Sequence, residues 1–133
     1  MRAAGIDSSR CHILTWLTSA PTTRFADLIT ADIDISVGSI DSLNAVAFAA
    51  RKLGKPARVH VKVDTGFGRN GFTPEGFSAA LEKLQQYSSE GVIEVIGQWS
   101  HLAVADSPDV PEFVDATDRQ IQQFHEFTTV SYT

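Results

Sequence analysis

The chain has 133 residues, 43% of them apolar and 20% charged, a composition typical of one soluble domain with a hydrophobic core. The formal net charge of −5 argues against nucleic acid as a partner, because phosphate binding normally shows as a basic surface. The single cysteine, Cys11, cannot form an internal disulfide, and the longest apolar run, residues 45–50, is too short to span a bilayer. We therefore expect a cytoplasmic globular protein, or part of one, with no membrane partner.

Strand and helix patterns alternate along the chain. The first five residues are typical of a last helical turn closed by glycine, which suggests that the chain begins inside a larger domain. Short apolar runs predict four strands, at residues 12–17, 33–37, 58–63 and 93–99. Amphipathic patterns predict helices at residues 25–31, 39–54 and 74–87, with Ser39 and Thr73 as N-caps of the last two.

The last helix is expected to begin later in the chain. Thr117 and Gln120 have the spacing of a capping box, and Ile121 and Phe124 would then face inward. From His125 onward the sequence is rich in poor helix formers. Either this helix ends early or the tail does not belong to the domain.

Strict alternation of strands and helices implies a parallel sheet with right-handed crossovers. An open doubly wound sheet and a (βα)8 barrel both satisfy this order. Polar residues opposite the apolar strand faces suit a barrel lumen, and polar clusters at strand carboxyl ends match the place where barrel enzymes carry their chemistry. We predict an α/β fold, a partial (βα)8 barrel of about four β/α units.

The third predicted strand carries the first candidate site. Alternation places its valines against the helices and directs His60, Lys62 and Asp64 into the lumen. A bare Lys62 cation buried near Arg69 would be costly without a compensating negative charge. Either Asp64 pairs with Lys62 as a structural brace, or Lys62 is chemically modified.

The glycine-rich loop after this strand holds Arg69, whose planar guanidinium suits bidentate contact with a carboxylate. The loop has neither the ending of a phosphate-binding Walker motif nor the helix that follows a dinucleotide fingerprint. His101 follows the fourth strand and is the second candidate. The histidines have no metal-ligand spacing, so we predict no metal. Trp16, near the end of the first predicted strand, could wall the pocket, but we favour a core role.

Two segments point to a known protein family more specifically than the strand and helix patterns do. Residues 61–71, Val-Lys-Val-Asp-Thr-Gly-Phe-Gly-Arg-Asn-Gly, closely resemble the K-x-D-T-G-M-G-R-x-G signature of bacterial alanine racemases. Residues 97–106 are similar to the family's G-x-x-T/S-H-x-A-x-A-D segment, and Gln123, Phe124 and Phe127 fit its Q-x-x-x-F helix. The resemblance extends up to about Phe127.

The resemblance implies a pyridoxal-phosphate-dependent barrel enzyme that interconverts L- and D-alanine as a homodimer and supplies D-alanine for peptidoglycan. By this resemblance Arg69 contacts the cofactor's phenolic oxygen and the substrate carboxylate. Lys62 matches a lysine that is often N-carboxylated, and its carbamate would orient Arg69. His101 matches a histidine in the hydrogen-bond network behind the cofactor ring.

The chain also departs from the family pattern. Nothing in it matches the V-K-A-N-A-Y-G-like segment with the cofactor lysine, or the catalytic tyrosine of the C-terminal β domain, and Tyr132 has no matching context. Residues 1–133 are therefore expected to be an incomplete N-terminal barrel domain that lacks both catalytic bases and is inactive alone. The alternatives are another pyridoxal-phosphate barrel enzyme, an amino-acid decarboxylase or a D-amino-acid dehydratase, or a non-catalytic fragment that self-associates through open strand edges.

Overall fold

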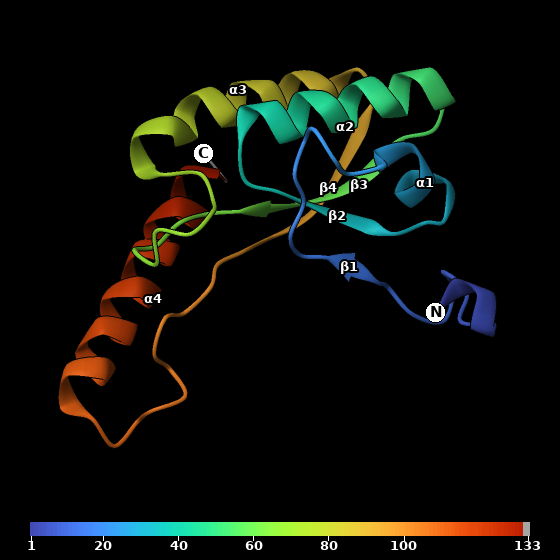
Figure 1. Cartoon of the computed structure of the whole chain (residues 1–133). Coiled ribbons are helices and arrows are strands. Elements are labelled where there is room, and N and C mark those ends of the chain that lie inside the picture. The colour runs from blue at the N-terminus through green and yellow to red at the C-terminus, as the bar shows by residue number, and fades with distance from the viewer. Residues whose placement is uncertain (132–133) are drawn as a thin grey trace.

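The computed structural model describes residues 1–131 and shows a parallel sheet with a helix between successive strands (Figure 1). The strands are β1 (Leu14–Thr15), β2 (Asp34–Val37), β3 (Ala57–Lys62) and β4 (Ile93–Trp99). The helices are a short 3-10 turn η1 (Arg2–Ala4), α1 (Phe25–Thr30), α2 (Ile40–Leu53), α3 (Pro74–Ser89) and α4 (Pro111–Ser131).

The strands lie in sequential order, β1-β2-β3-β4, and every pair is parallel. A doubly wound sheet reverses its strand order at a switch point, whereas a barrel adds each strand on the same side. Figure 1 shows α2 and α3 side by side over one face of the sheet. The predicted α/β partial barrel is therefore confirmed.

The two faces of β3 differ as the alternation predicts. Val59 and Val61 are buried at 0% and 3% exposure among the helices, and His60 and Lys62 point to the opposite, lumenal face. A β-bulge between β3 and β4 shifts the register after Val59, so that His60 lies opposite Gly97. A Cβ at Gly97 would lie 3.4 Å from Nδ1 of His60, so glycine leaves room for the imidazole ring.

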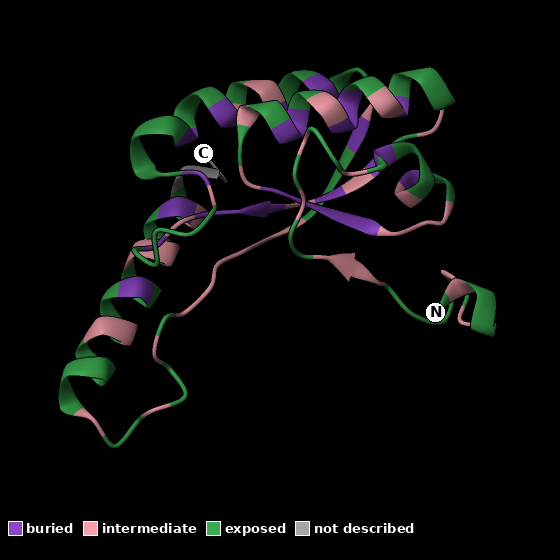
Figure 2. Ribbon diagram, in the orientation of Figure 1, coloured by how far each residue is buried: buried purple, intermediate pink, exposed green. Residues whose placement is uncertain are grey.

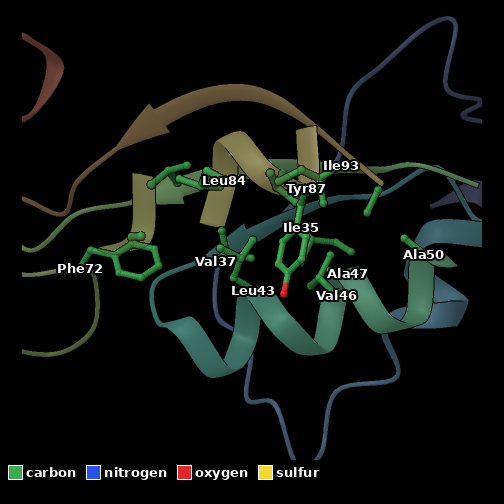
Figure 3. Packing of buried hydrophobic residues seen from close by; sticks show 14 of the residues in the cluster. Ile35, Val37, Leu43, Val46, Ala47, Ala50, Phe72, Leu84, Tyr87 and Ile93 are labelled. Carbon is green, nitrogen blue, oxygen red and sulfur yellow. The ribbon is translucent and has the colours of Figure 1, made fainter. Parts of the chain in front are cut away.

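Helix α2 forms because its sequence supplies a cap and one apolar stripe. Ser39 accepts a hydrogen bond from the backbone N–H of Ser42, and the Ser42 side chain bonds back to complete a capping box. Gly54 ends the helix in the left-handed conformation, with φ of 61°. The buried stripe packs against β2, β3 and α3 (Figure 3), and its members are Leu43, Val46, Ala47 and Ala50.

Helix α3 begins at Pro74, where a missing N–H costs nothing, as predicted. Thr73 occupies the N-cap position, but its side chain makes no capping hydrogen bond to the backbone. The Tyr87 hydroxyl donates to Oδ1 of Asn44 at 2.8 Å and joins α3 to α2. The core therefore lies between this helix pair and the sheet.

The expectations for the last helix are partly wrong. Helix α4 begins at Pro111 and runs through Ser131, so no helix starts at Thr117 and the segment after His125 does not end the helix. Ile121 is 41% exposed, although Phe124 packs against the core as expected. Figure 2 shows buried, intermediate and exposed bands along α4. Phe127 meets Phe77 of α3 edge-on at 4.8 Å. The tail residue Tyr132 lies outside the described residues.

The first predicted strand is also shorter than expected. Only Leu14–Thr15 pairs with β2, because the chain then turns away and Thr18 reaches the Ser36 carbonyl through its side chain, at 2.9 Å. Within residues 1–131, no helix is both long and apolar enough to cross a membrane.

Candidate functional site

The carboxyl ends of β3 and β4 carry the candidate residues. Because the strands are parallel, the two segments that follow them leave from the same edge of the sheet. We call residues 64–71 the Arg69 loop and residues 100–106 the His101 segment. The topology thus brings Lys62, Arg69 and His101 to one end of the partial barrel.

The Arg69 loop is closed by its own residues. Asp64 Oδ1 accepts hydrogen bonds from the N–H groups of Gly66 and Gly68, at 2.9 and 3.0 Å, and both glycines have positive φ. The Phe72 N–H donates to the Lys62 carbonyl at 2.9 Å and joins the two ends of the loop. The loop amides bound by Asp64 are therefore not free to hold a phosphate, in agreement with the absence of a Walker ending in the sequence.

Lys62 is buried, with 1% of its surface exposed. Its Nζ lies 4.8 Å from the ring centroid of Trp99, and it has no hydrogen-bond partner among the described residues. Burial, and then the positive charge of Arg69, lower the pKa of Lys62, while the Asp64 carboxylate acts in the opposite direction. Because Asp64 is occupied by its own loop, the structure shows no hydrogen-bonded Lys62–Asp64 brace.

Arg69 and His101 lie on the ring of Phe67. The Arg69 guanidinium carbon is 4.7 Å from the Phe67 centroid, and the His101 ring centroid is 4.6 Å from it. The guanidinium also lies 5.5 Å from the ring of Trp16. Trp16 is 48% exposed, so its expected core role is wrong. The aromatic rings lie beside the cation, and among the described residues no group accepts a hydrogen bond from Arg69, so its N–H donors are available to a carboxylate or phenolate oxygen.

The sequence interpretation missed one residue of the site. The buried side chain of Gln120, on α4, accepts from the Ala103 N–H at 2.8 Å and donates to Thr65 Oγ1 and to the His101 carbonyl, both at 3.1 Å. In the sequence, Gln120 follows Thr117 at the spacing of a capping box, which predicts a capping residue. Its hydrogen-bond partners come from two loops that are distant in the sequence, which no local pattern reveals.

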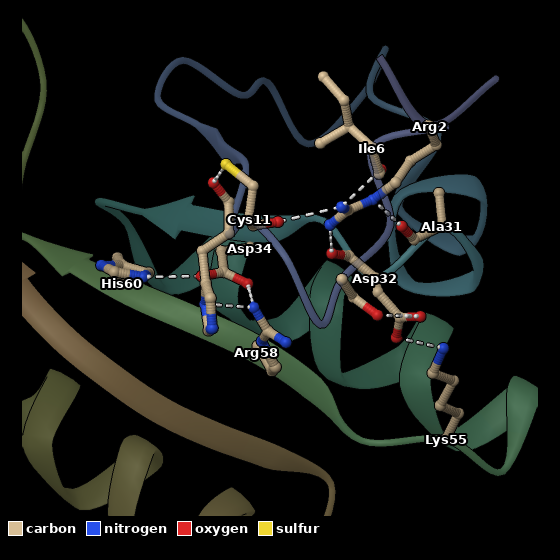
Figure 4. Close-up of polar contacts among 11 residues, drawn as sticks. Arg2, Ile6, Cys11, Ala31, Asp32, Asp34, Lys55, Arg58 and His60 are labelled. Atoms are coloured by element: carbon tan, nitrogen blue, oxygen red, sulfur yellow. Dashed lines mark hydrogen bonds and ion pairs between the residues drawn. The ribbon is translucent and has the colours of Figure 1, made fainter. Parts of the chain in front are cut away.

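A second polar cluster lies at the opposite ends of the strands (Figure 4). Asp34, only 1% exposed, contacts His12 at 3.1 Å, His60 at 3.2 Å and the Arg58 guanidinium. Burial raises the pKa of Asp34, but the contacts with these three groups outweigh it and lower the pKa below its ordinary value. This end of a barrel serves stability rather than catalysis. His60 therefore belongs to a structural cluster.

Nearby, Arg2 fastens the N-terminal segment to α1. Its guanidinium donates to the carbonyls of Ala31, Asp32, Ile6 and Cys11 (Figure 4).

Among residues 1–131, no group of three or more His, Cys, Asp or Glu side chains is placed to hold a metal ion.

The sequence and the fold of the chain match those of known proteins. The family model described as alanine racemase, N-terminal domain, matches residues 1–131. The chain belongs to this family. It is 42% identical over 130 residues to an alanine racemase of Thermobifida fusca, and 46% identical over 111 residues to one of Frankia casuarinae. The alanine racemase structure of Streptomyces lavendulae has a TM-score of 0.88 and 35% identity over 98% of this chain.

These family members are much longer than this chain. It covers 33% of the Thermobifida protein, 28% of the Frankia protein and 32% of the Streptomyces structure. The chain thus spans about a third of the length of its alanine racemase relatives. The resemblance expected from residues 61–71 and 97–106 is confirmed.

Proposed function

We propose that residues 1–133 form part of the N-terminal barrel domain of an alanine racemase that interconverts L- and D-alanine, with a C-terminal β domain outside this chain. The observation that carries the proposal is that Arg69 and His101 both contact the ring of Phe67, near the buried Lys62, in a family member. We expect the chain to be inactive alone, because racemisation needs a base on each face of the substrate Cα.

The residues present fit pyridoxal phosphate, the cofactor that the family implies. The Arg69 guanidinium lies beside aromatic rings, so its donors remain available to the phenolic oxygen, and His101 lies against the same Phe67 ring. The cofactor, when bound, supplies an electron sink for the substrate Cα. Arg69 and His101 would form one wall of its pocket, and the residue that anchors it would lie elsewhere in the full enzyme.

Arg69 has the main binding role. Its planar, permanently charged group is suited to two parallel hydrogen bonds with the substrate carboxylate. Contacts with the rings of Phe67 and Trp16 restrict the movement of the guanidinium before the substrate arrives. A guanidinium held in this way loses little conformational entropy on binding.

Lys62 supports Arg69 through its charge. The lowered pKa increases the fraction of neutral amine, the form that reacts with carbon dioxide. N-carboxylation would replace an unpartnered buried ammonium by an anion that attracts the neighbouring Arg69. We propose that Lys62 is carboxylated and orients Arg69, which would explain the charge problem seen in the sequence.

The remaining expectations concern the full-length protein. His101 would take part in the hydrogen-bond network behind the cofactor ring, since its ring is fixed against Phe67. We further propose a homodimeric cytoplasmic enzyme whose product, D-alanine, enters peptidoglycan. The absence of any spanning helix among the described residues is compatible with that location.

A chimera tests the proposed function. Residues 1–131 would replace the matching segment of the Thermobifida fusca alanine racemase, with which they are 42% identical. We expect the purified chimera to convert L-alanine to D-alanine, and the 133-residue chain mixed with pyridoxal phosphate to produce none. A folded, cofactor-loaded chimera that releases carbon dioxide from amino acids, or leaves alanine unchanged, would contradict the proposal.

Self-association is a second candidate behaviour of the isolated chain. The edge strand β4 exposes Val95 and Ile96, at 44% and 36%. An apolar groove of about 610 Å³ runs between β4 and α3, with Leu81 and Leu84 on its helical side. An edge strand with exposed apolar residues favours pairing with another copy. Sedimentation that shows a monodisperse monomer would rule this out.

A further inference from the structure

Gln120 is a buried amide on a helix whose surface is otherwise largely exposed. Only 5% of the residue is accessible, so an unbonded amide here would be strongly unfavourable. Its oxygen accepts from the Ala103 N–H, and its nitrogen donates to Thr65 Oγ1 and to the His101 carbonyl. Both amide N–H groups are therefore used, and every partner lies in the Arg69 loop or the His101 segment.

The direction of these hydrogen bonds follows from the chemistry of the partners. A backbone N–H can only donate, so Ala103 identifies the Gln120 atom facing it as the oxygen. The Ser100 hydroxyl donates to the Val63 carbonyl at 2.9 Å, which leaves its oxygen to accept from Thr65 at 2.8 Å. Thr65 in turn accepts from Gln120.

The result is a series of hydrogen bonds that all run in one direction, from Gln120 through Thr65 and Ser100 to the carbonyl of Val63, the residue that follows β3. Hydrogen bonds that run in one direction polarise and strengthen each other in a buried environment. These hydrogen bonds connect three segments: α4, the Arg69 loop and the His101 segment. Breaking the series at Gln120 frees both the Arg69 loop and the His101 segment from α4. Breaking it at Thr65 frees the Arg69 loop from α4 and from Ser100, but leaves the His101 segment bonded to Gln120.

We propose that Gln120 is a positioning residue that sets the Arg69 loop and the His101 segment relative to each other. It contacts neither Arg69 nor the His101 ring, and acts through Thr65 and the His101 and Ala103 backbone. The inference rests on the proposed function for the importance of Arg69 and His101, but the positioning itself is a property of this chain without cofactor. Its test therefore does not depend on racemase activity.

The test uses NMR of the full 133-residue chain. The Phe67 ring lies against both Arg69 and His101, so ring currents displace the Arg69 Nε–H and His101 Cδ2–H resonances. Gln120→Met removes all three hydrogen bonds at similar side-chain volume. We expect both resonances to move toward unstructured values and Ala103 amide-exchange protection to fall roughly tenfold. The methyl resonances of Val46, buried under α2, report whether the core stays folded.

The matched control is Gln122→Met, which makes the same change at an exposed position of α4. We expect wild-type resonances from it. If Gln120→Met also displaces the Val46 methyls, the chain has unfolded, and Thr65→Val then decides the question. This isostere of threonine removes the hydrogen bonds from Thr65 to Gln120 and to Ser100, so the Arg69 and His101 resonances should both shift as Phe67 moves with the loop. The Ala103 amide should keep its protection, because its bond to Gln120 remains.

Two results would overturn the proposal. In one, a folded Gln120→Met chain keeps both ring-current shifts, which would make Gln120 only a buried helix residue. In the other, Thr65→Val leaves both ring-current shifts unchanged, or lowers Ala103 amide protection as much as Gln120→Met does, because loss of the Thr65 hydrogen bonds alone cannot free the Ala103 amide from Gln120. An inactive chimera would contradict the racemase assignment while leaving these measurements unchanged.

Discussion

The buried ammonium of Lys62 offers a quantitative prediction for stability. Lys62 is 1% exposed and its Nζ has no hydrogen-bond partner among the described residues, so Lys62→Met removes an unsatisfied buried polar group. Such a group costs about 1–3 kcal/mol, and the loss of the contact with Trp99 offsets about 0.5–1 kcal/mol of the gain. We expect the unmodified chain to become more stable by about 1–2 kcal/mol at neutral pH.

The matched control is Lys52→Met. Lys52 lies 4.8 Å from the ring of Phe48, the same distance that separates Lys62 from Trp99, but it is exposed on α2. Its substitution should change the free energy of unfolding by no more than about 0.5 kcal/mol. Urea unfolding followed by circular dichroism measures both variants. A less stable Lys62→Met chain would refute the reasoning, because it would mean that the ammonium has an anionic partner.

The pH dependence has a defined sign. The pKa of Lys62 is lowered in the folded chain, so the folded state releases its proton at a lower pH than the unfolded state. Between the lowered pKa and the ordinary value of 10.5, the unfolded state binds more protons and stability rises with pH. The advantage of Lys62→Met should shrink over that range. Bicarbonate should stabilise the wild-type chain but not the variant if Lys62 is carboxylated.

Two further substitutions test the ends of the sheet. Asp34→Asn should destabilise the chain by about 3 kcal/mol in urea unfolding, because the buried Arg58 contact loses its anion; a loss below about 1 kcal/mol would contradict this. The pKa of Asp34 is lowered in the folded state. Its contribution to the free energy of unfolding is therefore present above the ordinary value of 3.8 and is lost as pH falls through the folded value. The difference in stability between Asp34→Asn and wild type should narrow in acid. Gly71→Ala should distort the Arg69 loop and lower the melting temperature. The new Cβ would lie 2.6 Å from the Asp64 nitrogen, at a residue whose φ is 135°. An unchanged melting temperature would contradict this, because it would show that the loop relaxes freely.

The sequence predicted what local chemistry determines. Period-2 valines placed the faces of β3, Ser39 and Gly54 marked the ends of α2, and the glycine-rich loop identified the position of Arg69. These features depend on neighbours within a few residues. They can therefore be recognised from the amino-acid sequence alone.

The errors arise where distant segments decide the outcome. Trp16 is apolar enough for a core, but the chain leaves β2 after Thr15 and brings the ring to Arg69 instead. The contact between Lys62 and Trp99 depends on a bulge that shifts the register of β4. Gln120 is buried because two loops supply its partners, so its spacing from Thr117 was a misleading local signal.

The central claim is that Arg69 binds the substrate carboxylate in a racemase. It is tested most directly by Arg69→Lys in the Thermobifida chimera, with Arg119→Lys, an exposed position on α4, as the control. Loss of a charged bidentate contact, worth about 1.5–3 kcal/mol, should lower kcat/KM for L-alanine roughly 10- to 100-fold. The control should keep the activity of the parent chimera. Equal kcat/KM values for the two variants would contradict the account.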